Sequence, residues 1–460
     1  MNVVKKFLFV LGIASTTISL NAAQIQSKLL DGDQKRPKNL LSSFSGVQEK
    51  KRLLIICDTL DSLEAPEIGG TELVLSKIGK ELISNKYDFI VECMDLPYPS
   101  YPRTKIARPE ICWRNGLDSA HQRAVAQKIS TFKPDYILIA LHGIMSYQAA
   151  CYCTDNKIPF TAFCSTRHPQ FIDENIPVPA YPVVGSSVKW FKSKFVKTAT
   201  AYENSFLKRG ASVLVPSLSF KKELEDREVK NIAVWPHGVD LEFFTLPSVQ
   251  EKIQARKRCD LQGRKGPFYL YVTRLTREKN VQGFLDLKIT SGTKILVGPD
   301  GTYKAQDLRK EYSDIIIPGM KQGKELLDYY HSADIFVFPS KKDVFGLVTL
   351  EALACGLPIV AFNTTGPAEV VPLGCGVSVL ADADNDATLA ISAYQAWCNL
   401  QNKVITPEMC RAYAERFTWE NATNILVDNL HEITPLSLQS AQSSKPTESC
   451  NCFSRCLRRK

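Results

Sequence analysis

Short apolar runs alternate with helical patterns along most of this chain, and this alternation limits the fold more than any other feature of the sequence. The first run, Arg52 to Cys57, precedes a loop and a helical pattern from Thr71 to Leu82. Strands that alternate with helices form a parallel sheet that helices cover on both faces. The sequence therefore predicts α/β domains of the doubly wound, Rossmann-like kind. Further predicted strands lie at 89–93, 136–141, 160–164, 213–215, 232–235, 268–272, 295–297, 315–317, 335–338 and 359–362.

The length of 460 residues allows two such domains with additional segments at both ends. The second half repeats the alternation of the first, and two more helical patterns follow it. We therefore expect two Rossmann-like domains rather than one. The predicted segments are a signal-like or anchor segment at 1–23, a linker at 24–50, an N-terminal domain at 51–245, a C-terminal domain at 250–410, helices at 411–434, and a disordered, basic, cysteine-containing tail at 435–460.

The N-terminal segment has the composition of a secretory signal. Lys5 and Lys6 precede an apolar run at 7–20, and the small residues at 21–23 offer a cleavage region. The run is too short for a comfortable transmembrane helix. The segment is predicted to be either a cleaved signal or an anchor at the membrane surface.

Charge and cysteine content give weaker indications. The formal net charge of +9 favours anionic partners, such as nucleotides or acidic lipids, and gives no reason to expect nucleic acid. Most of the 14 cysteines stand singly in apolar runs, as Cys57 and Cys355 do, so we expect reduced core thiols. Cys151 and Cys153 have no nearby histidine pair, so no metal site is expected there.

One loop in the second half carries two acids with seven residues between them, Asp343 and Glu351. It follows the predicted strand at 335–338 and contains Phe345-Gly346, where a small residue lets a ligand approach the backbone. The amides at the start of the next helix can face an anion. Taken alone, the acid pair is also explained by ordinary helix capping and dipole interactions.

Other candidate residues lie at the ends of predicted strands. Arg274 and Lys279 follow the strand at 268–272, and ligands of open α/β sheets bind at that edge. Two permanent cations there can hold an anionic ligand without a metal, or they can be a solvated loop pair. Gly69-Gly70 precedes the first helix, where it serves either as a close approach to a ligand or as a simple turn.

These stretches closely resemble the GT-B glycosyltransferases of the family-4 type, also called group 1, and in particular bacterial GDP-mannose-dependent alpha-mannosyltransferase-like proteins. The likeness rests on the acid-seven-acid loop with Leu350–Val360, on Trp235–Phe244, and on 133–137 and 158–161. It extends over most of residues 51–430. The resemblance implies two Rossmann-like domains that face each other across a cleft, with a C-terminal helix that crosses back to the first domain.

In that family the first acid contacts hydroxyls of the donor sugar, the second contacts the ribose, and an Arg and a Lys contact the diphosphate. Carried over by position, the resemblance implies the following sites, without a metal. The catalytic set is Arg274, Lys279, Asp343 and Glu351; the donor-binding set is Gly69, Gly70, Thr273, Gly319, Met320, Phe345, Gly346, Leu347 and Val348; and the acceptor side holds Ser165, His168 and His237.

Several positions depart from the family pattern. Thr273 replaces a usual glycine, Ser165 a histidine, His142 a glutamate and His237 an arginine. Thr273 would crowd the diphosphate if its side chain pointed inward. His168 either substitutes for the missing histidine or is a hydrogen-bonded structural residue.

The resemblance implies a retaining, metal-independent transfer of a hexose, of the mannose or glucose type, from a nucleoside-diphosphate sugar to a lipid or envelope-glycan acceptor. The donor is a co-substrate and no cofactor is expected. A catalytically reduced nucleotide-sugar-binding protein is the main alternative, because the acceptor half is altered. A sugar-nucleotide epimerase or phosphorylase is a third hypothesis, although neither matches the acid-seven-acid loop.

Aromatic and basic residues interleave at 188–197 within about three helical turns. Such a helix can rest on an anionic bilayer, or it can pack its aromatic side chains on the sheet. Nucleotide sugars are made in the cytosol, so we expect the protein at the cytoplasmic face of a membrane, with export after signal cleavage as the alternative.

Overall fold

The computed structural model describes residues 50–58, 70–84, 87, 89–94, 117–141, 144–175 and 182–433, apart from 365, 373, 374 and 384. The segments at 1–23 and 435–460, nearly all of the linker at 24–50, and the residues Gly69 and His142 lie outside the described residues.

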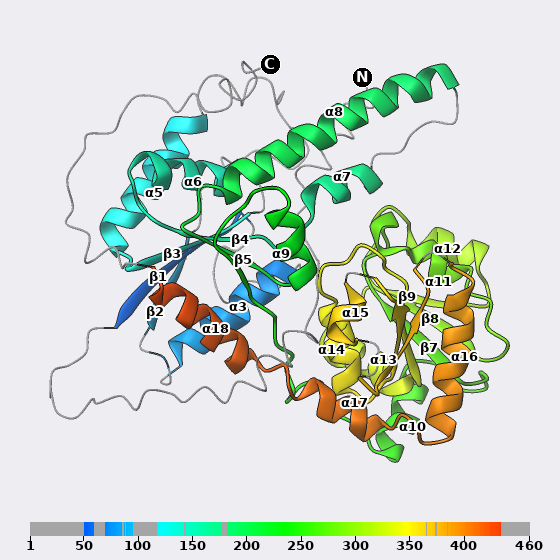
Figure 1. Cartoon of the computed structure of the whole chain (residues 1–460). Helices are drawn as coiled ribbons and strands as arrows, with labels where there is room; N and C mark the ends of the chain where they lie inside the picture. Colours follow the sequence, from blue (N-terminus) through cyan, green and yellow to red (C-terminus); the bar gives the residue numbers. More distant parts are fainter. Residues whose placement is uncertain are drawn as a thin grey trace, which may run out of the picture.

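Two parallel six-stranded sheets form the framework, and each belongs to a separate lobe (Figure 1). Their strand orders are β2-β1-β3-β4-β5-β6 and β12-β11-β10-β7-β8-β9. Both orders are those of doubly wound sheets, so the predicted α/β class with two Rossmann-like sheets is confirmed. The strands are β1 (Lys51–Ile56), β2 (Phe89–Met94), β3 (Tyr136–Ala140), β4 (Thr161–Phe163), β5 (Ser212–Val215), β6 (Ile232–Val234), β7 (Phe268–Val272), β8 (Thr293–Val297), β9 (Ile316–Gly319), β10 (Ile335–Phe338), β11 (Ile359–Phe362) and β12 (Ser378–Ala381).

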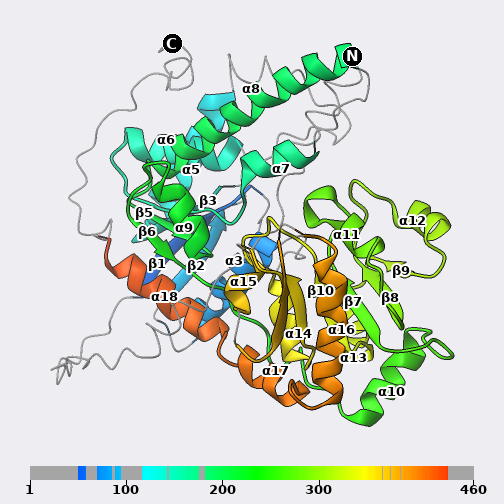
Figure 2. The ribbon, with the colours of Figure 1, turned by 45° about the vertical axis from the view of Figure 1, so that its right-hand side comes forward.

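Helices cover both faces of each sheet, as the views in Figures 1 and 2 show. The central strands are fully buried because helices shield them on either side, which explains why their sequences are continuous apolar runs. In the first lobe the helices are α3 (Gly70–Ile83), α5 (Leu117–Phe132), α6 (Ile144–Asp155), α7 (His168–Asn175), α8 (Pro182–Leu207) and α9 (Leu218–Glu225). The second lobe has α10 (Val249–Arg258), the 3₁₀ helix η1 (Arg277–Lys279), α11 (Val281–Leu285), α12 (Ala305–Glu311), α13 (Gly323–Ser332), α14 (Leu347–Ala354), α15 (Pro367–Val370), α16 (Thr388–Gln401) and α17 (Pro407–Ala414).

The last described helix, α18 (Trp419–His431), crosses back and packs on the first lobe beside α3 (Figure 1). The indole nitrogen of Trp235, at the end of β6, donates to the carbonyl of Ala422 at 2.8 Å. Leu426 and Leu430 are fully buried in the core between α18 and the first sheet. The predicted crossover helix is therefore confirmed, and it ties the end of the described chain to the first domain.

Helix α8 is much longer than the pattern at 188–197 predicts, and in Figure 1 its N-terminal part projects beyond the first sheet, which the helix reaches at its C-terminal end. Trp190 on this helix is 53% exposed, and the Lys194 ammonium lies 4.2 Å from the centre of its ring. Trp190 is therefore not packed on the sheet. Among the described helices, none combines the length and apolar character that a membrane span needs.

The cysteines in the described part of the chain are all free, and most of them are buried. Burial raises the pKa of Cys153 to about 12, so its thiol stays protonated. The buried cysteines among them are core residues, as predicted, and their reduced state stays a prediction.

Candidate active site

The candidate catalytic residues come from two loops at the same edge of the second sheet. Strands β7 and β10 are parallel neighbours, with Ile335 opposite Tyr269. The chain leaves both strands at their carboxyl ends, so the loop that carries Arg274 and Lys279 lies beside the loop that carries Asp343. In doubly wound sheets this edge is where ligands bind.

Lys279 and Asp343 form a buried ion pair between these loops. The Lys279 Nζ lies 2.7 Å from Asp343 Oδ1, and the two side chains are only 6% and 2% exposed. Asn280 follows with a positive φ of 49° and donates from its amide to the carbonyl of Pro339 at 3.0 Å. The two loops are thus joined by a charged and a neutral hydrogen bond, which fixes the ammonium of Lys279 at the sheet edge.

Arg274 lies on the same loop as Lys279 and is half-buried. Burial lowers the pKa of its guanidinium from the usual value, while the charges of Glu278 and Glu72 raise it. Glu72 belongs to α3 of the first domain and is itself buried. A carboxylate of one domain therefore acts electrostatically on a candidate diphosphate-binding cation of the other.

Thr273, which replaces a usual glycine, is hydrogen-bonded through its backbone to the neighbouring strand β8. Its backbone N–H donates to Val297 O at 2.9 Å, and its side chain lies close enough to the buried phenol of Tyr271 to oppose the rise in the pKa of that phenol. The Tyr271 hydroxyl donates in turn to Lys279 O at 2.7 Å. The Thr273 side chain is thus near a core residue of the second domain.

Gly346 starts helix α14 in a conformation that favours glycine. Its φ is 95°, and a Cβ at this position would lie 2.7 Å from Thr349 Oγ1. The following amides, those of Leu347 and Val348, form the first turn of the helix, where backbone N–H groups have no partner within the helix. Such a turn attracts an anion, and that these residues face a diphosphate stays a prediction.

Glu351 lies one turn further along α14 and is partly buried. The hydroxyl of Tyr330 on α13 donates to Glu351 Oε2 at 2.6 Å. Tyr330 is completely buried, so its phenol restrains the Glu351 carboxylate from the core side.

The remaining donor-side candidates occupy different settings. Gly319 ends β9 with a φ of 86°, and its carbonyl accepts from Gly298 N at 2.9 Å. Met320 follows it and is 54% exposed. Phe345 is completely buried, and Gly70 is the first residue of α3. Of these residues, Gly319 and Met320 lie at the carboxyl end of the edge strand β9, and no described contact joins them to the Lys279–Asp343 pair.

On the first domain, Ser165 is buried and its hydroxyl lies 2.6 Å from that of Thr71 on α3. The shorter side chain that replaces the usual histidine is thus satisfied by a neighbour within the same domain.

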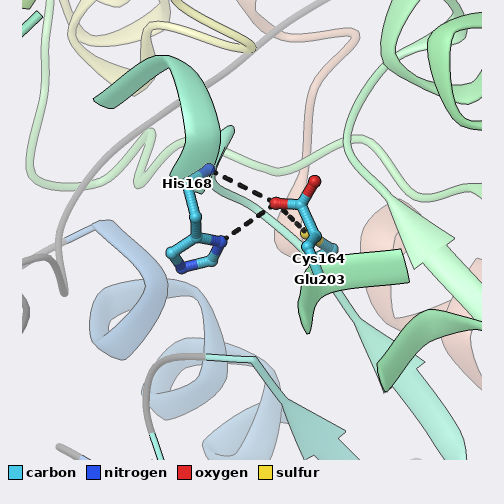
Figure 3. Close-up of side chains that lie close together, drawn as sticks. All are labelled: Cys164, His168 and Glu203. Carbon is cyan, nitrogen blue, oxygen red and sulfur yellow. Dashed lines mark hydrogen bonds and ion pairs between the residues drawn. The ribbon is translucent and has the colours of Figure 1, made fainter. Parts of the chain in front are cut away.

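His168 takes part in a buried network with Glu203 of α8 (Figure 3). Its Nδ1 lies 3.1 Å and its backbone N 3.3 Å from Glu203 Oε1, and the guanidinium of Arg227 pairs with the other carboxylate oxygen. Burial opposes ionisation of Glu203, but the bonds and charges of His168 and Arg227 outweigh it and lower the pKa of the carboxyl. Of the two interpretations open for His168, the structure supports the hydrogen-bonded structural one.

Cys164, His168 and Glu203 lie close enough to share a metal ion, with ligand atoms within 4.8 Å of one another (Figure 3). Burial raises the pKa of the Cys164 thiol well above its ordinary value, whereas a zinc ligand must be a thiolate. Arg227 already pairs with Glu203, and its positive charge opposes a cation. The group fits a hydrogen-bonded network better than an ion site.

His237 is 3% exposed and lies among aromatic rings. Its ring centre is 4.6 Å from that of Phe345 in the second domain and 5.9 Å from that of Trp235. Burial lowers the pKa of His237 to about 3, so the imidazole is neutral. It meets the second domain as an apolar contact, in place of the charged contact that an arginine would make.

Three residues of the site were not found from the sequence: Glu72, Asn280 and Tyr330. Asn280 gave a usable signal, because an asparagine before a helical pattern is a typical N-cap, and its side chain accepts from Gly283 N. Glu72 and Tyr330 gave none, since acids in a first helical turn and tyrosines in amphipathic helices are common.

The two facing α/β domains, the crossover helix and the paired cation and acid at the edge of the second sheet define a GT-B protein. Two family models match the chain. Residues 257–393 match "Glycosyl transferases group 1", and residues 68–243 match "Glycosyltransferase Family 4". The chain belongs to this family of glycosyltransferases.

Curated relatives agree with this membership. The chain is 30% identical to a sulfoquinovosyl transferase of Arabidopsis thaliana over 264 residues, which are 56% of the chain and 48% of that protein. It is 26% identical to a GDP-mannose-dependent alpha-mannosyltransferase of Mycobacterium tuberculosis over 52% of the chain and 58% of that protein. An alpha-monoglucosyldiacylglycerol synthase of Streptococcus pneumoniae is 33% identical over 34% of the chain and 38% of its own length. The chain thus spans about half or less of the length of these relatives.

Solved structures share the fold. Sucrose-phosphate synthase from Thermosynechococcus elongatus superposes with a TM-score of 0.63 at 17% identity, over 83% of this chain and 99% of that one. The Anabaena protein Alr3699/HepE, in complex with UDP and glucose, gives a TM-score of 0.60 at 16% identity, over 83% of this chain and all of that one. At such low identities the likeness shows the GT-B fold alone.

Proposed function

We propose that this protein transfers a hexose from a nucleoside-diphosphate sugar to a lipid or envelope-glycan acceptor, with retention of anomeric configuration and without a metal. The observation that carries the proposal is the buried Lys279–Asp343 pair at the carboxyl edge of the second sheet. A mannosyltransferase that depends on GDP-mannose and a protein solved with UDP and glucose are among the proteins it resembles.

The transition state of such a transfer carries new negative charge on the departing diphosphate and positive charge at the anomeric carbon. In the proposal, Lys279 and Arg274 stabilise the diphosphate, together with the amides in the first turn of α14. Asp343 holds the ammonium of Lys279 in place and meets hydroxyls of the donor sugar. Glu351, oriented by Tyr330, holds the ribose. The leaving phosphate accepts the proton of the acceptor hydroxyl, so no separate base is needed.

A thermal-shift screen of GDP-, UDP- and ADP-sugars against the wild type and Glu351→Ala tests donor binding. One donor is expected to stabilise the wild type, and the shift is expected to shrink in the variant. NMR of the product would then give the anomeric configuration, and turnover in EDTA would test metal independence. An unchanged shift in Glu351→Ala would remove this residue from the site.

A catalytically reduced, nucleotide-sugar-binding protein is a second candidate, favoured by Ser165 in place of the usual histidine. It predicts stabilisation by a donor without release of nucleoside diphosphate. Release of nucleoside diphosphate from the bound donor by the purified protein would exclude it.

We further propose that the protein works at the cytoplasmic face of a membrane and touches the bilayer through α8. The exposed Trp190 with Lys194 over its ring gives this helix the mixed aromatic and basic character of interfacial segments. Vesicles with anionic lipid should sediment the wild type more than the Trp190→Ala, Lys194→Ala double variant. Loss of residues 1 to about 23 from the native protein, read by intact mass, would favour the alternative of export after signal cleavage.

A further inference from the structure

We propose that Arg167 of the first domain is a positioning residue for the donor loop, which we define as Lys342–Gly346 of the second domain. This inference rests on the proposed function, because it assigns the placement of the loop that holds Asp343. Arg167 follows β4 and is 7% exposed. Its Nη1 donates to the carbonyl of Lys342 at 3.2 Å, across the boundary between the domains.

Two residues of α9, Glu223 and Phe220, contact the Arg167 side chain. Its Nε lies 2.8 Å from Glu223 Oε2, and its guanidinium carbon lies 5.5 Å from the centre of the Phe220 ring. The guanidinium thus contacts the Lys342 carbonyl, the Glu223 carboxylate and the Phe220 ring. Its planar, forked shape allows all three contacts, whereas an ammonium could not make them together. The side chain therefore presents its Nη1 to the donor loop in one orientation.

Close backbone packing within the second domain also restrains the donor loop. A Cβ on Gly366 would lie 2.2 Å from the carbonyl oxygen of Asp343, so the backbones at these two residues are in close contact. Since Lys342 O accepts from Arg167 and Asp343 O abuts Gly366, the peptide planes on both sides of the Asp343 side chain are restrained. That restraint directs the Asp343 carboxylate to Lys279.

The residues that follow Asp343 also contact the first domain. Val344 is completely buried in the hydrophobic core of that domain, and Phe345 packs on His237. From the other direction, the carboxylate of Glu369 on α15 accepts from Ser219 N at 3.3 Å, at the start of α9. Helix α9 is thus bonded to the second domain directly through Ser219 and indirectly through Arg167. The described geometry of the donor loop thus includes contacts from the first domain at Lys342, Val344 and Phe345.

The test compares Arg167→Lys with the matched control Arg227→Lys. Both wild-type arginines pair with Glu223, but Arg227 has no described contact with the second domain. We expect Arg167→Lys to raise the KM for the donor about tenfold or more, the loss that corresponds to a hydrogen bond from a charged donor, with a smaller change in kcat. Arg227→Lys should leave the donor KM within about twofold of the wild type.

A second measurement does not depend on turnover. Hydrogen exchange of the donor-loop amides in the ligand-free protein should be faster in Arg167→Lys than in the wild type, and unchanged in Arg227→Lys. Equal effects of the two variants on KM and on exchange, or no effect of Arg167→Lys, would overturn the positioning role. Failure of the wild type to bind any of the GDP-, UDP- or ADP-sugars would instead refute the proposed function, while the exchange comparison would still decide whether Arg167 holds the loop.

Discussion

The ion pair between Lys279 and Asp343 predicts a specific pattern of stability and ligand response. At the observed 2.7 Å separation and an effective dielectric constant of ~20, the gross attraction is about 6 kcal/mol. Removal of one partner leaves the other charge buried and uncompensated, which costs about 3–5 kcal/mol. We therefore expect Asp343→Asn and Lys279→Met each to lower the free energy of unfolding by that amount.

The double variant Lys279→Met, Asp343→Asn should be much less destabilised than the sum of the two single variants, because it leaves no unpaired charge. Urea unfolding of the four proteins without ligand measures the coupling. Lys304→Met is the control, since its pair with Asp300 is 3.7 Å long and about half-exposed. Such a surface pair contributes at most about 1 kcal/mol.

Nucleoside diphosphate separates the structural role of the pair from its proposed functional role. In Asp343→Asn the bound diphosphate supplies the missing counter-charge of Lys279, so its stabilising effect should be at least as large as in the wild type. In Lys279→Met most of that effect should disappear. Additive losses in the double variant would refute the buried-pair reasoning, and a normal diphosphate response of Lys279→Met would refute its place in the donor site.

Three further changes have expected outcomes. Tyr330→Phe removes the hydroxyl that donates to Glu351, and we expect weaker donor binding by about tenfold in calorimetry, since hydrogen bonds to charged groups contribute about 1.5–3 kcal/mol; an unchanged Kd would contradict the orienting role. His237→Phe should flatten the loss of stability in acid: the pKa of His237 falls from 6.5 in the unfolded chain to about 3 in the fold, so its contribution is present above pH 6.5 and is lost as pH falls toward 3. Melting curves at pH 5 and pH 7.5 would show it, and an equal pH dependence in the variant would refute it. Leu426→Ala should cost about 2–5 kcal/mol, because the side chain of this residue on α18 is completely buried in the core of the first domain; a cost below about 1 kcal/mol would show that the crossover helix does not support that domain.

Most of the sheet framework could be predicted from the sequence because its central strands are buried on both faces. Runs such as 335–338 and 268–272 are continuously apolar, and this pattern predicts buried strands. Strand β12 (Ser378–Ala381) was missed, since it lies at the edge of the second sheet and three of its four residues are only partly buried. The length of α8 was also missed, because most of the helix lies outside the aromatic and basic pattern that drew attention to it.

The site could be predicted as a set of residues but not as a set of contacts. Lys279 and Asp343 were both chosen from the sequence, yet they are 64 residues apart and meet only because β7 and β10 are neighbours in the sheet. Local sequence contains no information on that strand order. The contact of Arg167 with Lys342 is harder still to anticipate, since it also depends on how the two domains dock.

Two of the substituted positions of the first domain, Ser165 and His237, have well-defined contacts in the structure. Ser165 is satisfied by Thr71 within the first domain, whereas His237 lies neutral against Phe345 of the donor loop and is part of the interface between the domains. Arg167 of the first domain bonds the donor loop, and Val344 and Phe345 of the loop pack on the first domain. These contacts link docking of the first domain to the position of Asp343. If the donor loop binds the sugar nucleotide as proposed, docking of the first domain therefore influences donor affinity through the position of this loop.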